Sequence, residues 1–588
     1  MDPTSITNTT TNNKNPHVIF IPFPAQSHIK CMLKLATLLH HNGVRITFVN
    51  TDFNHKRLLT HSGSPFLHDG LRNPNGSGGV PVPDNGAEPV QTVEELSAYL
   101  MDNFLDSFLD LVDGLDAPPT CIVCDGFMTF TNAGYAAEKL RVPMMVYWTL
   151  SAVGFMGYYQ AKVLTESGVI PLKDESYLTN GYVDKLIDWI PGMEELRLRD
   201  LPEHILATIP DDPSLNFLVE AARVAAKVSH MIIHTFDGLE NDLVKELKSI
   251  FPRIYTVGPL QLLLNQITEK ETKPSNFNGY SLWKEEPECV KWLDSKEPNS
   301  VVYINFGSLA VMCLQDILEL GWGLVNSDHT FLWIIRTDLV DGGSAVLPPE
   351  FMEAVNRKGF IGSWCSQEEV LNHPSVGGFL THCGWGSVIE SLSAGVPMLC
   401  RPVAHDQRTN CRQLVKGWEV GVEIEGDVER DEVERLVRML MEGKESKKMR
   451  DKVMEWKKSA EIAAGFNGSS SLNIENLTQM DTPSITNTNT TTTTTTNKNP
   501  HVIFIPFPAQ SHIKCMLKLA TLLHHNGVRI TFVNTDFNHK RLLTHSGSPF
   551  LHDGLRNPSF QFKTVPGAFP FPTTALSPFR RWRNSALI

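Results

Sequence analysis

The stretch Val18-Ile-Phe-Ile-Pro-Phe23 is an apolar run of the kind found in buried strands. It is followed by the turn sequence Pro24-Ala-Gln-Ser27 and then by Ile29–His40, in which apolar residues recur at helical spacing. A strand, a turn and a helix in this order form the repeating unit of a parallel sheet whose faces are covered by helices. The N-terminal region is therefore expected to be α/β.

The same alternation continues along the chain in two series, separated by the polar stretch Thr268–Glu288. The strands that we predict are Val44–Val49, Thr120–Cys124 and Met144–Trp148 in the first series, and, after Ile254–Val257, Val301–Phe306, Phe331–Ile335, Gly359–Gly362, Val376–Thr381 and Pro397–Cys400 in the second. This pattern predicts two doubly wound domains with a cleft between them, and ligands are expected at the carboxyl ends of the strands.

A long internal repeat is the most unusual feature of the sequence. Residues Asn13–Pro74 recur without a change as Asn497–Pro558, an offset of 484 over 62 residues. The run Thr490–Thr496 before the second copy is typical of a low-complexity, disordered linker. With two copies so far apart, the repeat is not that of a solenoid. A tandem-gene fusion or a mispredicted coding sequence explains it more simply than a functional third domain does.

The two copies diverge immediately after the repeated segment. The second continues as Ser559–Pro566, whose alternating pattern predicts a strand, whereas the first continues as Asn75–Pro83, which has loop chemistry. The first copy thus lacks a strand that the second retains. The second copy could supply that strand only if two identical first strands competed for one place in the sheet.

Composition excludes several classes of protein. The chain has 588 residues, 41% of them hydrophobic, and a net charge of −13, which argues against a broad nucleic-acid-binding surface. The 10 scattered cysteines suit reduced thiols better than a disulfide framework.

Residues 1–16 lack the apolar core of a secretory signal, and the uncharged stretch Pro143–Tyr159 divides into a strand and a helix opened by Ser151. We expect a cytoplasmic protein without a transmembrane segment, and a monomer.

A dense block of chemically distinctive residues occupies the second half. It runs over 44 residues through Trp364-Cys-Ser-Gln367, His373, Gly378-Phe-Leu-Thr-His-Cys-Gly-Trp-Gly-Ser387, Glu390, Gly395-Val-Pro-Met398 and Asp406-Gln407. This block closely resembles the PSPG signature of plant UDP-dependent glycosyltransferases, and the resemblance covers nearly all of 13–477 except 75–95. Within that family the chain is most similar to the subgroup that glucosylates cyanohydrins and iridoid aglycones. The resemblance implies a GT-B fold, two Rossmann-like domains facing a cleft.

The block also suits a UDP-glucose site on chemical grounds. A helix beginning near Gly384 would direct free N–H groups and the positive end of its dipole at a diphosphate. His382 and Ser387 flank that helix start, Trp364 offers a flat face to a uracil ring, and Glu390 can accept from ribose hydroxyls. The donor-binding residues that we predict are Gly307, Ser308, Trp364, Cys365, Gln367, His382, Gly384, Trp385, Gly386, Ser387, Glu390, Asp406 and Gln407. The last two would reach the sugar, and the resemblance associates Gln407 with glucose. Such a site needs no metal or other cofactor.

The catalytic base predicted from the sequence is His28, with Asp125 as its partner. Each follows a predicted strand of the first domain, so parallel strand ends would place both on the rim of the cleft. A histidine paired with a carboxylate can remove the proton of an acceptor hydroxyl while the carboxylate stabilises the imidazolium. The resemblance gives these two residues the same roles. His512 duplicates His28, but neither Asp125 nor the Trp364–Gln407 block is repeated, so the tail cannot form a second active site alone.

Structural explanations remain open for several of these residues. Asp125 could simply cap a helix, Glu390 could be a surface residue of a helix, and Trp385 could be core packing. Cys121 and Cys124 have redox spacing, yet in a strand they face opposite sides, and core thiols are the better interpretation.

The sequence departs from the family pattern at a few positions. Gly386 stands where the family usually has Asn, Ser27 replaces a usual Gly, and Lys30-Cys31 replace Asn-Pro. The stretch Arg401–His405 is less aromatic than usual. The most serious departure is the strand missing after Pro74, because a parallel sheet is buried on both faces. We therefore expect reduced activity or poor folding relative to an intact family member.

These observations predict an inverting O-glucosyltransferase that joins glucose from UDP-glucose to a hydroxyl of a small plant-type aglycone: an iridoid, cyanohydrin, terpenoid or phenolic. The rival hypothesis is a catalytically impaired protein that only binds a nucleotide sugar or a small apolar ligand, and a further possibility is that the fused chain never accumulates. The predicted organisation is a disordered 1–16, an acceptor domain 17–253, a donor domain 254–456, a helix 457–479 that packs back on the first domain, a linker 480–496, and a partial duplicate 497–588 without its own function.

Overall fold

The structure is a computed structural model that describes two short strands near the N-terminus and most of the chain beyond residue 103. The described residues are 17–20, 45–48, 104–106, 108–115, 118–131, 133–193, 195–209, 212–269, 285–308, 310–336, 339, 347–478, 500–507, 510–535, 539 and 560–565. The segments Ile29–His40 and Asn75–Pro83 lie outside this part, as does His28.

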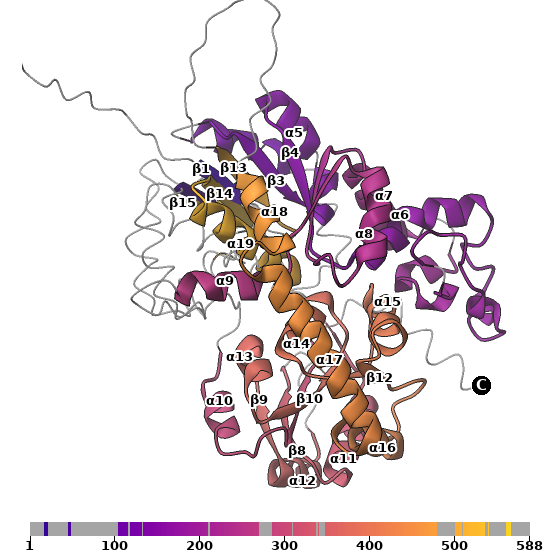
Figure 1. Ribbon diagram of the computed structural model, residues 1–588. Helices are drawn as coiled ribbons and strands as arrows, with labels where there is room; N and C mark the ends of the chain where they lie inside the picture. Colours follow the sequence, from indigo (N-terminus) through magenta and orange to yellow (C-terminus); the bar gives the residue numbers. More distant parts are fainter. Residues whose placement is uncertain are drawn as a thin grey trace, which may run out of the picture.

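Two parallel sheets, each covered by helices, make up the described fold (Figure 1). The first sheet contains β1 (His17–Phe20), β2 (Arg45–Phe48), β3 (Cys121–Asp125), β4 (Met144–Trp148), β5 (His230–Ile233), β6 (Arg253–Thr256), β13 (His501–Ile505), β14 (Arg529–Thr535) and β15 (Phe560–Val565). The second contains β7 (Val301–Asn305), β8 (Thr330–Ile334), β9 (Gly359–Gly362), β10 (Val376–Thr381), β11 (Met398–Cys400) and β12 (Gly421–Glu423). The predicted α/β class with two doubly wound domains is confirmed.

The second sheet has the order β12-β11-β10-β7-β8-β9, which is the doubly wound order 3-2-1-4-5-6 read from the other edge. Its strands read as continuous apolar runs because both faces are buried. The helices around it are α10 (Glu288–Leu293), α11 (Leu314–Asn326), α12 (Pro349–Lys358), α13 (Gln367–Asn372), α14 (Trp385–Ala394), α15 (Gln407–Arg412), α16 (Arg430–Met441) and α17 (Gly443–Ala464).

The first sheet has the order β15-β14-β1-β13-β3-β4-β5-β6, with β2 paired to β1. Its helices are α5 (Ala133–Leu140), α6 (Ala152–Glu166), α7 (Pro213–Ala225), α8 (Asn241–Ile250), α9 (Leu260–Glu269), α18 (Ser469–Thr478) and α19 (Gln510–His525). The boundary between the two domains was predicted between residues 253 and 254. The β6 strand spans this position and pairs with β5, so it belongs to the first sheet. The α18 helix is hydrogen-bonded to the end of β6, where Asn473 Nδ2 donates to the carbonyl of Thr256 (2.9 Å).

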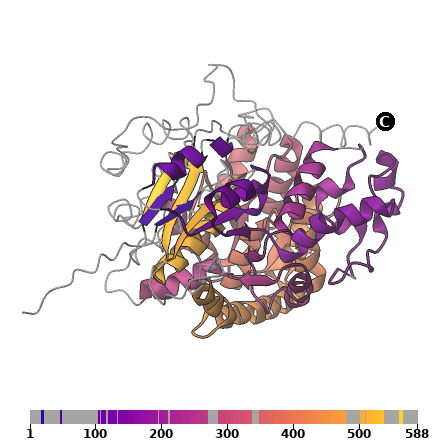
Figure 2. The ribbon, with the colours of Figure 1, turned by 90° about the horizontal axis from the view of Figure 1, so that it is seen from above.

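The C-terminal repeat lies inside the first sheet rather than apart from it. The β13 strand pairs with β3 through Ile505 and Cys124, and it pairs with β14 at four positions. The β14 strand pairs with β15 at six positions, which confirms the strand predicted at Ser559–Pro566. Figure 2 shows the yellow strands of the repeat among the indigo and purple ones. The β1 strand of the first copy lies between β14 and β13 in this order, although β14 and β13 also pair directly. Without β1 and β2, the order is β15-β14-β13-β3-β4-β5-β6, which is 3-2-1-4-5-6 extended by a seventh strand when β13, β14 and β15 count as strands one to three.

Among the described residues, no helix combines the length and the apolar character that crossing a membrane requires.

The start of the α6 helix is held by two acceptors. Ser151 is the N-cap, as predicted, and its Oγ accepts from the N–H of Gly154 (3.0 Å). The buried carboxylate of Glu240 accepts from the N–H groups of Ala152 and Val153, both at 3.0 Å. Together they satisfy donors that a helix start otherwise leaves unpaired.

Replacing Glu240 by Ala is expected to lower the free energy of unfolding by about 2 kcal/mol or more, because two buried N–H groups lose their acceptor. Urea titration followed by circular dichroism measures this change. Glu246→Ala, on the exposed side of α8, is the matched control and should change the free energy by about 0.5 kcal/mol or less. Equal effects of the two substitutions would contradict this role for Glu240.

Candidate active site

Most of the predicted donor-binding residues gather at one edge of the second sheet, where its strands end. Gly307 follows β7, His382 and Gly384 follow β10, and Asp406 follows β11. Trp364 follows β9 and is buried. The parallel strand ends thus bring together residues that are up to 99 positions apart.

The α14 helix begins at this edge with Gly384 as its N-cap. The helix has 10 residues, and its first turn, which includes Gly386 and Ser387, has backbone N–H groups without partners inside the helix. Gly386 is half-buried, and Ser387 Oγ accepts from Gln367 Nε2 (2.9 Å). A helix start of this kind binds anions through its N–H groups and its dipole.

The His382 ring is enclosed by glycine backbone on two sides. A Cβ atom at Gly307 would lie 2.6 Å from His382 Nε2, and one at Gly384 would lie 2.4 Å from it. Gly307 also has a φ of +70°, which glycine adopts without strain. Burial, together with the charge of Arg336, lowers the pKa of His382 to about 4. The imidazole is therefore neutral at pH 7, with a single ring N–H.

Glu390 and Gln367 form a polar cluster behind the helix start. Gln367 Nε2 donates to Glu390 Oε2 (2.7 Å), and Gln367 Oε1 accepts from Asn305 Nδ2 (2.9 Å). Glu390 is buried and in contact with Lys514 of the repeat, so it is not a surface residue of its helix. Lys514 also pairs with Glu368. Sequence reasoning missed Asn305 and Lys514, although the polar Asn305 at the end of an apolar strand was a usable signal.

Asp406 and Gln407 begin α15 and are both buried. Burial raises the pKa of Asp406 to about 6, and a hydrogen bond from Asn410 Nδ2 (3.0 Å) opposes that rise. Gln407 Oε1 accepts from the backbone N–H groups of Val403 (2.8 Å) and Ala404 (3.0 Å). Since this fixes the amide oxygen, the amide NH₂ is the group that can donate to a ligand.

Two residues of the block serve packing. Trp385 is fully buried, and its Nε1 donates to the carbonyl of His234 at the end of β5 (2.6 Å), which ties α14 to the first domain. Cys365 is buried beside Tyr303, with Sγ 3.4 Å from the hydroxyl oxygen. Both side chains therefore support the site through packing.

A second polar network joins the two domains beside Asp406. Ser151 Oγ, at the start of α6, donates to Asn410 Oδ1 (2.9 Å). Asn410 Nδ2 donates in turn to the carbonyl of Cys383 (3.0 Å) and to Asp406. This network sets the distance between the α6 start and the α14 start. Sequence reasoning used Ser151 only as a helix cap and missed Asn410.

The first domain contributes a histidine–aspartate pair. Asp125, at the end of β3, is fully buried, and its Oδ1 accepts from the N–H of Phe127 (2.9 Å). His512 Nδ1 lies 2.9 Å from Asp125 Oδ2 and 3.0 Å from Oδ1. His512 is the counterpart of His28 in the second copy of the repeat. The predicted partner Asp125 thus contacts the histidine of the second copy, while the predicted base His28 lies outside the described residues.

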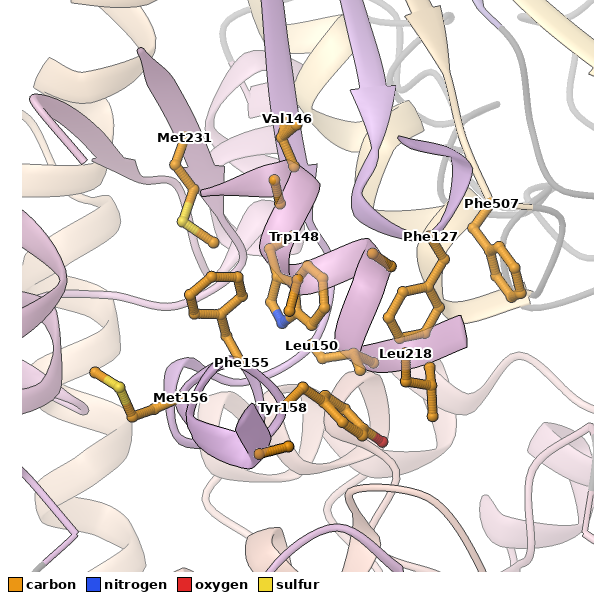
Figure 3. Close-up of a cluster of buried hydrophobic side chains, with 14 of the residues drawn as sticks. Phe127, Val146, Trp148, Leu150, Phe155, Met156, Tyr158, Leu218, Met231 and Phe507 are labelled. Carbon is orange, nitrogen blue, oxygen red and sulfur yellow. The ribbon is translucent and has the colours of Figure 1, made fainter. Parts of the chain in front are cut away.

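Aromatic side chains surround this pair. The Phe127 ring lies 4.7 Å from the His512 ring and 4.9 Å from that of Phe507, measured between centroids. Trp148 packs edge-on against Phe127 at 5.0 Å, and Tyr158 lies beyond both. Figure 3 shows this cluster, with Phe507 entering from the repeat and Phe127 from the segment after β3. Burial among these rings lowers the pKa of His512 well below its ordinary value.

Replacing Gly384 by Ala is expected to displace His382 and to distort the start of α14, because the added Cβ would overlap the imidazole. UDP, the ligand that the sequence resemblance implies, should then bind about tenfold or more weakly in calorimetry, about 1.4 kcal/mol. Gly114→Ala, where a Cβ meets ordinary contacts of 3.6 Å or more, is the control and should bind UDP as the parent does. Unchanged binding by the Gly384 variant would remove the α14 start from the site.

Comparison with known proteins shows the family of this chain. The family model described as UDP-glucoronosyl and UDP-glucosyl transferase matches residues 218–457. UDP-glycosyltransferase 85C1 of Stevia rebaudiana is 64% identical over 471 residues, covering 79% of this chain and 96% of the relative. The 7-deoxyloganetin glucosyltransferase of Gardenia jasminoides is 48% identical, covering 79% and 97%. The (R)-mandelonitrile beta-glucosyltransferase of Prunus dulcis is 47% identical with the same coverage.

Solved structures give the same result for the fold. A UDP-glucose:anthocyanidin 3-O-glucosyltransferase in complex with UDP superimposes with a TM-score of 0.65 at 26% identity, covering 79% of this chain and 98% of that one. Its two facing α/β domains are those of the GT-B fold, as expected from the sequence. On its fold and on relatives that are up to 64% identical over the aligned residues, this chain belongs to the UDP-dependent glycosyltransferases.

Proposed function

We propose that this enzyme transfers glucose from UDP-glucose to a hydroxyl group of a small, largely apolar aglycone and forms a β-O-glucoside. The observation that carries the proposal is the buried pair of His512 and Asp125, set among aromatic rings. Lys514, two residues beyond His512 on α19, contacts Glu390 of the donor block, so the pair and the donor site lie next to each other.

The pair can act as a general base. With Nδ1–H donated to the Asp125 carboxylate, the histidine presents Nε2 as the group that accepts a proton. As Nε2 takes the proton of the acceptor hydroxyl, its oxygen attacks the anomeric carbon of glucose. The bond from that carbon to the UDP oxygen breaks, and UDP departs with the electron pair. One in-line displacement inverts the α-linkage of the donor to a β-linkage.

The donor block supplies the remaining interactions. The α14 start, His382 and Ser387 would hold the diphosphate and stabilise the charge that develops on UDP. Glu390 would accept from the ribose, with Trp364 beside the uracil, and Asp406 and Gln407 would bind the glucose hydroxyls. These dipoles and neutral donors perform the work for which other transferases use a metal, so we propose a metal-independent reaction.

The acceptor class is inferred from the aromatic cluster and the named relatives. Phe127, Trp148 and Phe507 line the region of the base with apolar surface, which suits a compact aglycone with one reactive hydroxyl. Relatives at 46 to 48% identity are named for 7-deoxyloganetin, an iridoid, and for mandelonitrile, a cyanohydrin. We therefore propose an iridoid, cyanohydrin or related terpenoid or phenolic hydroxyl as the acceptor.

Two further properties belong to the proposal. We infer a cytosolic location, supported by the nine described cysteines, all of which are free thiols. We also infer a monomer, because both halves of the proposed site come from one chain.

The test is glucose transfer by the full chain from UDP-glucose to a panel of iridoid, cyanohydrin, terpenoid and phenolic acceptors. We expect UDP release together with a β-glucoside identified by NMR, at a rate that EDTA does not change. A protein that binds UDP-glucose in calorimetry without transferring sugar to any acceptor would contradict the proposal. That outcome would favour the impaired binding protein suggested by Gly386.

The pH dependence separates the base from the donor site. At saturating UDP-glucose, kcat/KM for the acceptor should fall in acid only below pH 6.5, because burial lowers the pKa of the histidine that must stay unprotonated. The KM for UDP-glucose should rise as the pH falls through about 6, where Asp406 gains a proton and becomes a weaker acceptor for the sugar hydroxyls. Initial rates between pH 4.5 and 9 measure both. An acid limb of the acceptor profile centred above pH 6.5 would contradict the assignment of a buried base.

A further inference from the structure

The sequence offers two identical candidates for the base, and only their surroundings can distinguish the two copies. His28 and His512 lie in the same 62-residue sequence, so their intrinsic chemistry is equal. Any difference in function must come from which copy occupies the place beside β3 and Asp125.

We propose that the C-terminal repeat completes the acceptor domain and supplies its catalytic base, so that His512 rather than His28 takes the proton from the acceptor. Three strands of the first sheet, β13, β14 and β15, would then come from the far end of the chain, with β1 and β2 of the first copy paired beside them. This inference rests on the proposed function for the chemistry of the base, and on the fold for the position of the repeat.

The β13 strand is anchored beside β3 at both ends. At its start, the carbonyl of His501 accepts from the N–H of Thr120 (2.5 Å), and His501 Nδ1 lies 2.7 Å from the carbonyl oxygen of Pro118. At its end, Ile505 is in register with Cys124, one residue before Asp125. This alignment carries the chain into α19, where His512 faces Asp125.

The α19 helix is bound on the donor side by two buried lysines. Lys518 is 1% exposed, and its Nζ donates to Glu368 Oε1 (3.0 Å) and to Gln261 Oε1 (3.3 Å). Lys514, also buried, pairs with Glu368 and Glu390. Buried ammonium groups are tolerated only when they are paired, so these contacts require the helix to sit between the two domains.

The sequence after the repeated segment favours the second copy over the first for the place beside β3. Only this copy continues into β15, which pairs with β14 at six positions and buries Phe560, Phe562 and Val565. The first copy continues instead into the Gly-rich stretch Asn75–Pro83. Since the copies are identical up to that point, the additional strand is what lets one copy bury more apolar surface than the other.

The connection to the repeat is long enough for this arrangement. The α18 helix ends at Thr478 beside β6, and β13 begins at His501, which leaves 22 residues between them. An extended chain of this length reaches about 70 Å. The sheet order places β13 four strand spacings from β6, which is about 19 Å. The linker therefore spans the distance with ample slack.

The experiment compares matched substitutions in the full chain. His512→Ala is expected to lower kcat about 100-fold or more, the usual contribution of a general base, while His28→Ala should stay within twofold of the parent. His512→Asn keeps an N–H donor for Asp125 and guards against misfolding, and it should lose the same activity with an unchanged circular dichroism spectrum. Loss of activity in His28→Ala with retention in His512→Ala would overturn the proposal. So would retention in both single variants with loss only in the double variant.

A second pair of variants reports on the position of the repeat without any need for turnover. Phe532 is fully buried in β14 and packs against Phe504 and Phe562, and its counterpart in the first copy is Phe48. Phe532→Ala should lower Tm by about 10 °C and Phe48→Ala by far less. The reverse order would overturn the proposal. The unsubstituted chain could also transfer no sugar while Phe532→Ala still lowers Tm more than Phe48→Ala does. That result would contradict the proposed function and leave the position of the repeat in the first sheet supported.

Discussion

The fold of the acceptor domain depends on one parallel pairing, that of β13 with β3. A central strand of a doubly wound sheet is buried on both faces, so its place cannot stay empty without exposing its neighbours to water. Here that place is taken by a segment that lies 380 residues beyond β3 in the sequence. This pairing determines the position of the base and the contact of Phe507 with Phe127. It also determines the lysine contacts to the donor domain.

The α19 helix of the repeat contributes both to the fold and to the proposed catalysis, because it contacts both domains. Its first turn brings His512 to Asp125, and its next turns bring Lys514 and Lys518 to Glu368. The same helix thus orients the base and joins the donor domain to the first domain. On the other side, the contacts of Ser151 with Asn410 and of Trp385 with His234 hold the two domains at matching positions.

Local sequence patterns predicted much of this structure. The strands Met144–Trp148, Gly359–Gly362 and Val376–Thr381 have the predicted bounds, since each is a short apolar run between turns. The strand His230–Ile233 was missed, because its four residues include a polar one and leave little periodicity to recognise. The choice between His28 and His512 could not be predicted at all, because local patterns are identical in the two copies. Contacts such as that of Lys514 with Glu390 depend on packing between distant elements, which periodicity does not encode.

The most direct test of this account is a disulfide between β13 and β3. Ile505 and Cys124 are in register on neighbouring strands and belong to the same hydrophobic cluster, so a cysteine at 505 would meet Cys124 at a separation that a disulfide can bridge. The matched control is Ile21→Cys, the same position in the first copy. After mild oxidation, peptide mass spectrometry should find Cys124 joined to residue 505 in the first variant and not to residue 21 in the second. A bond to residue 21 with none to residue 505 would show that the first copy fills the sheet, and it would contradict the account.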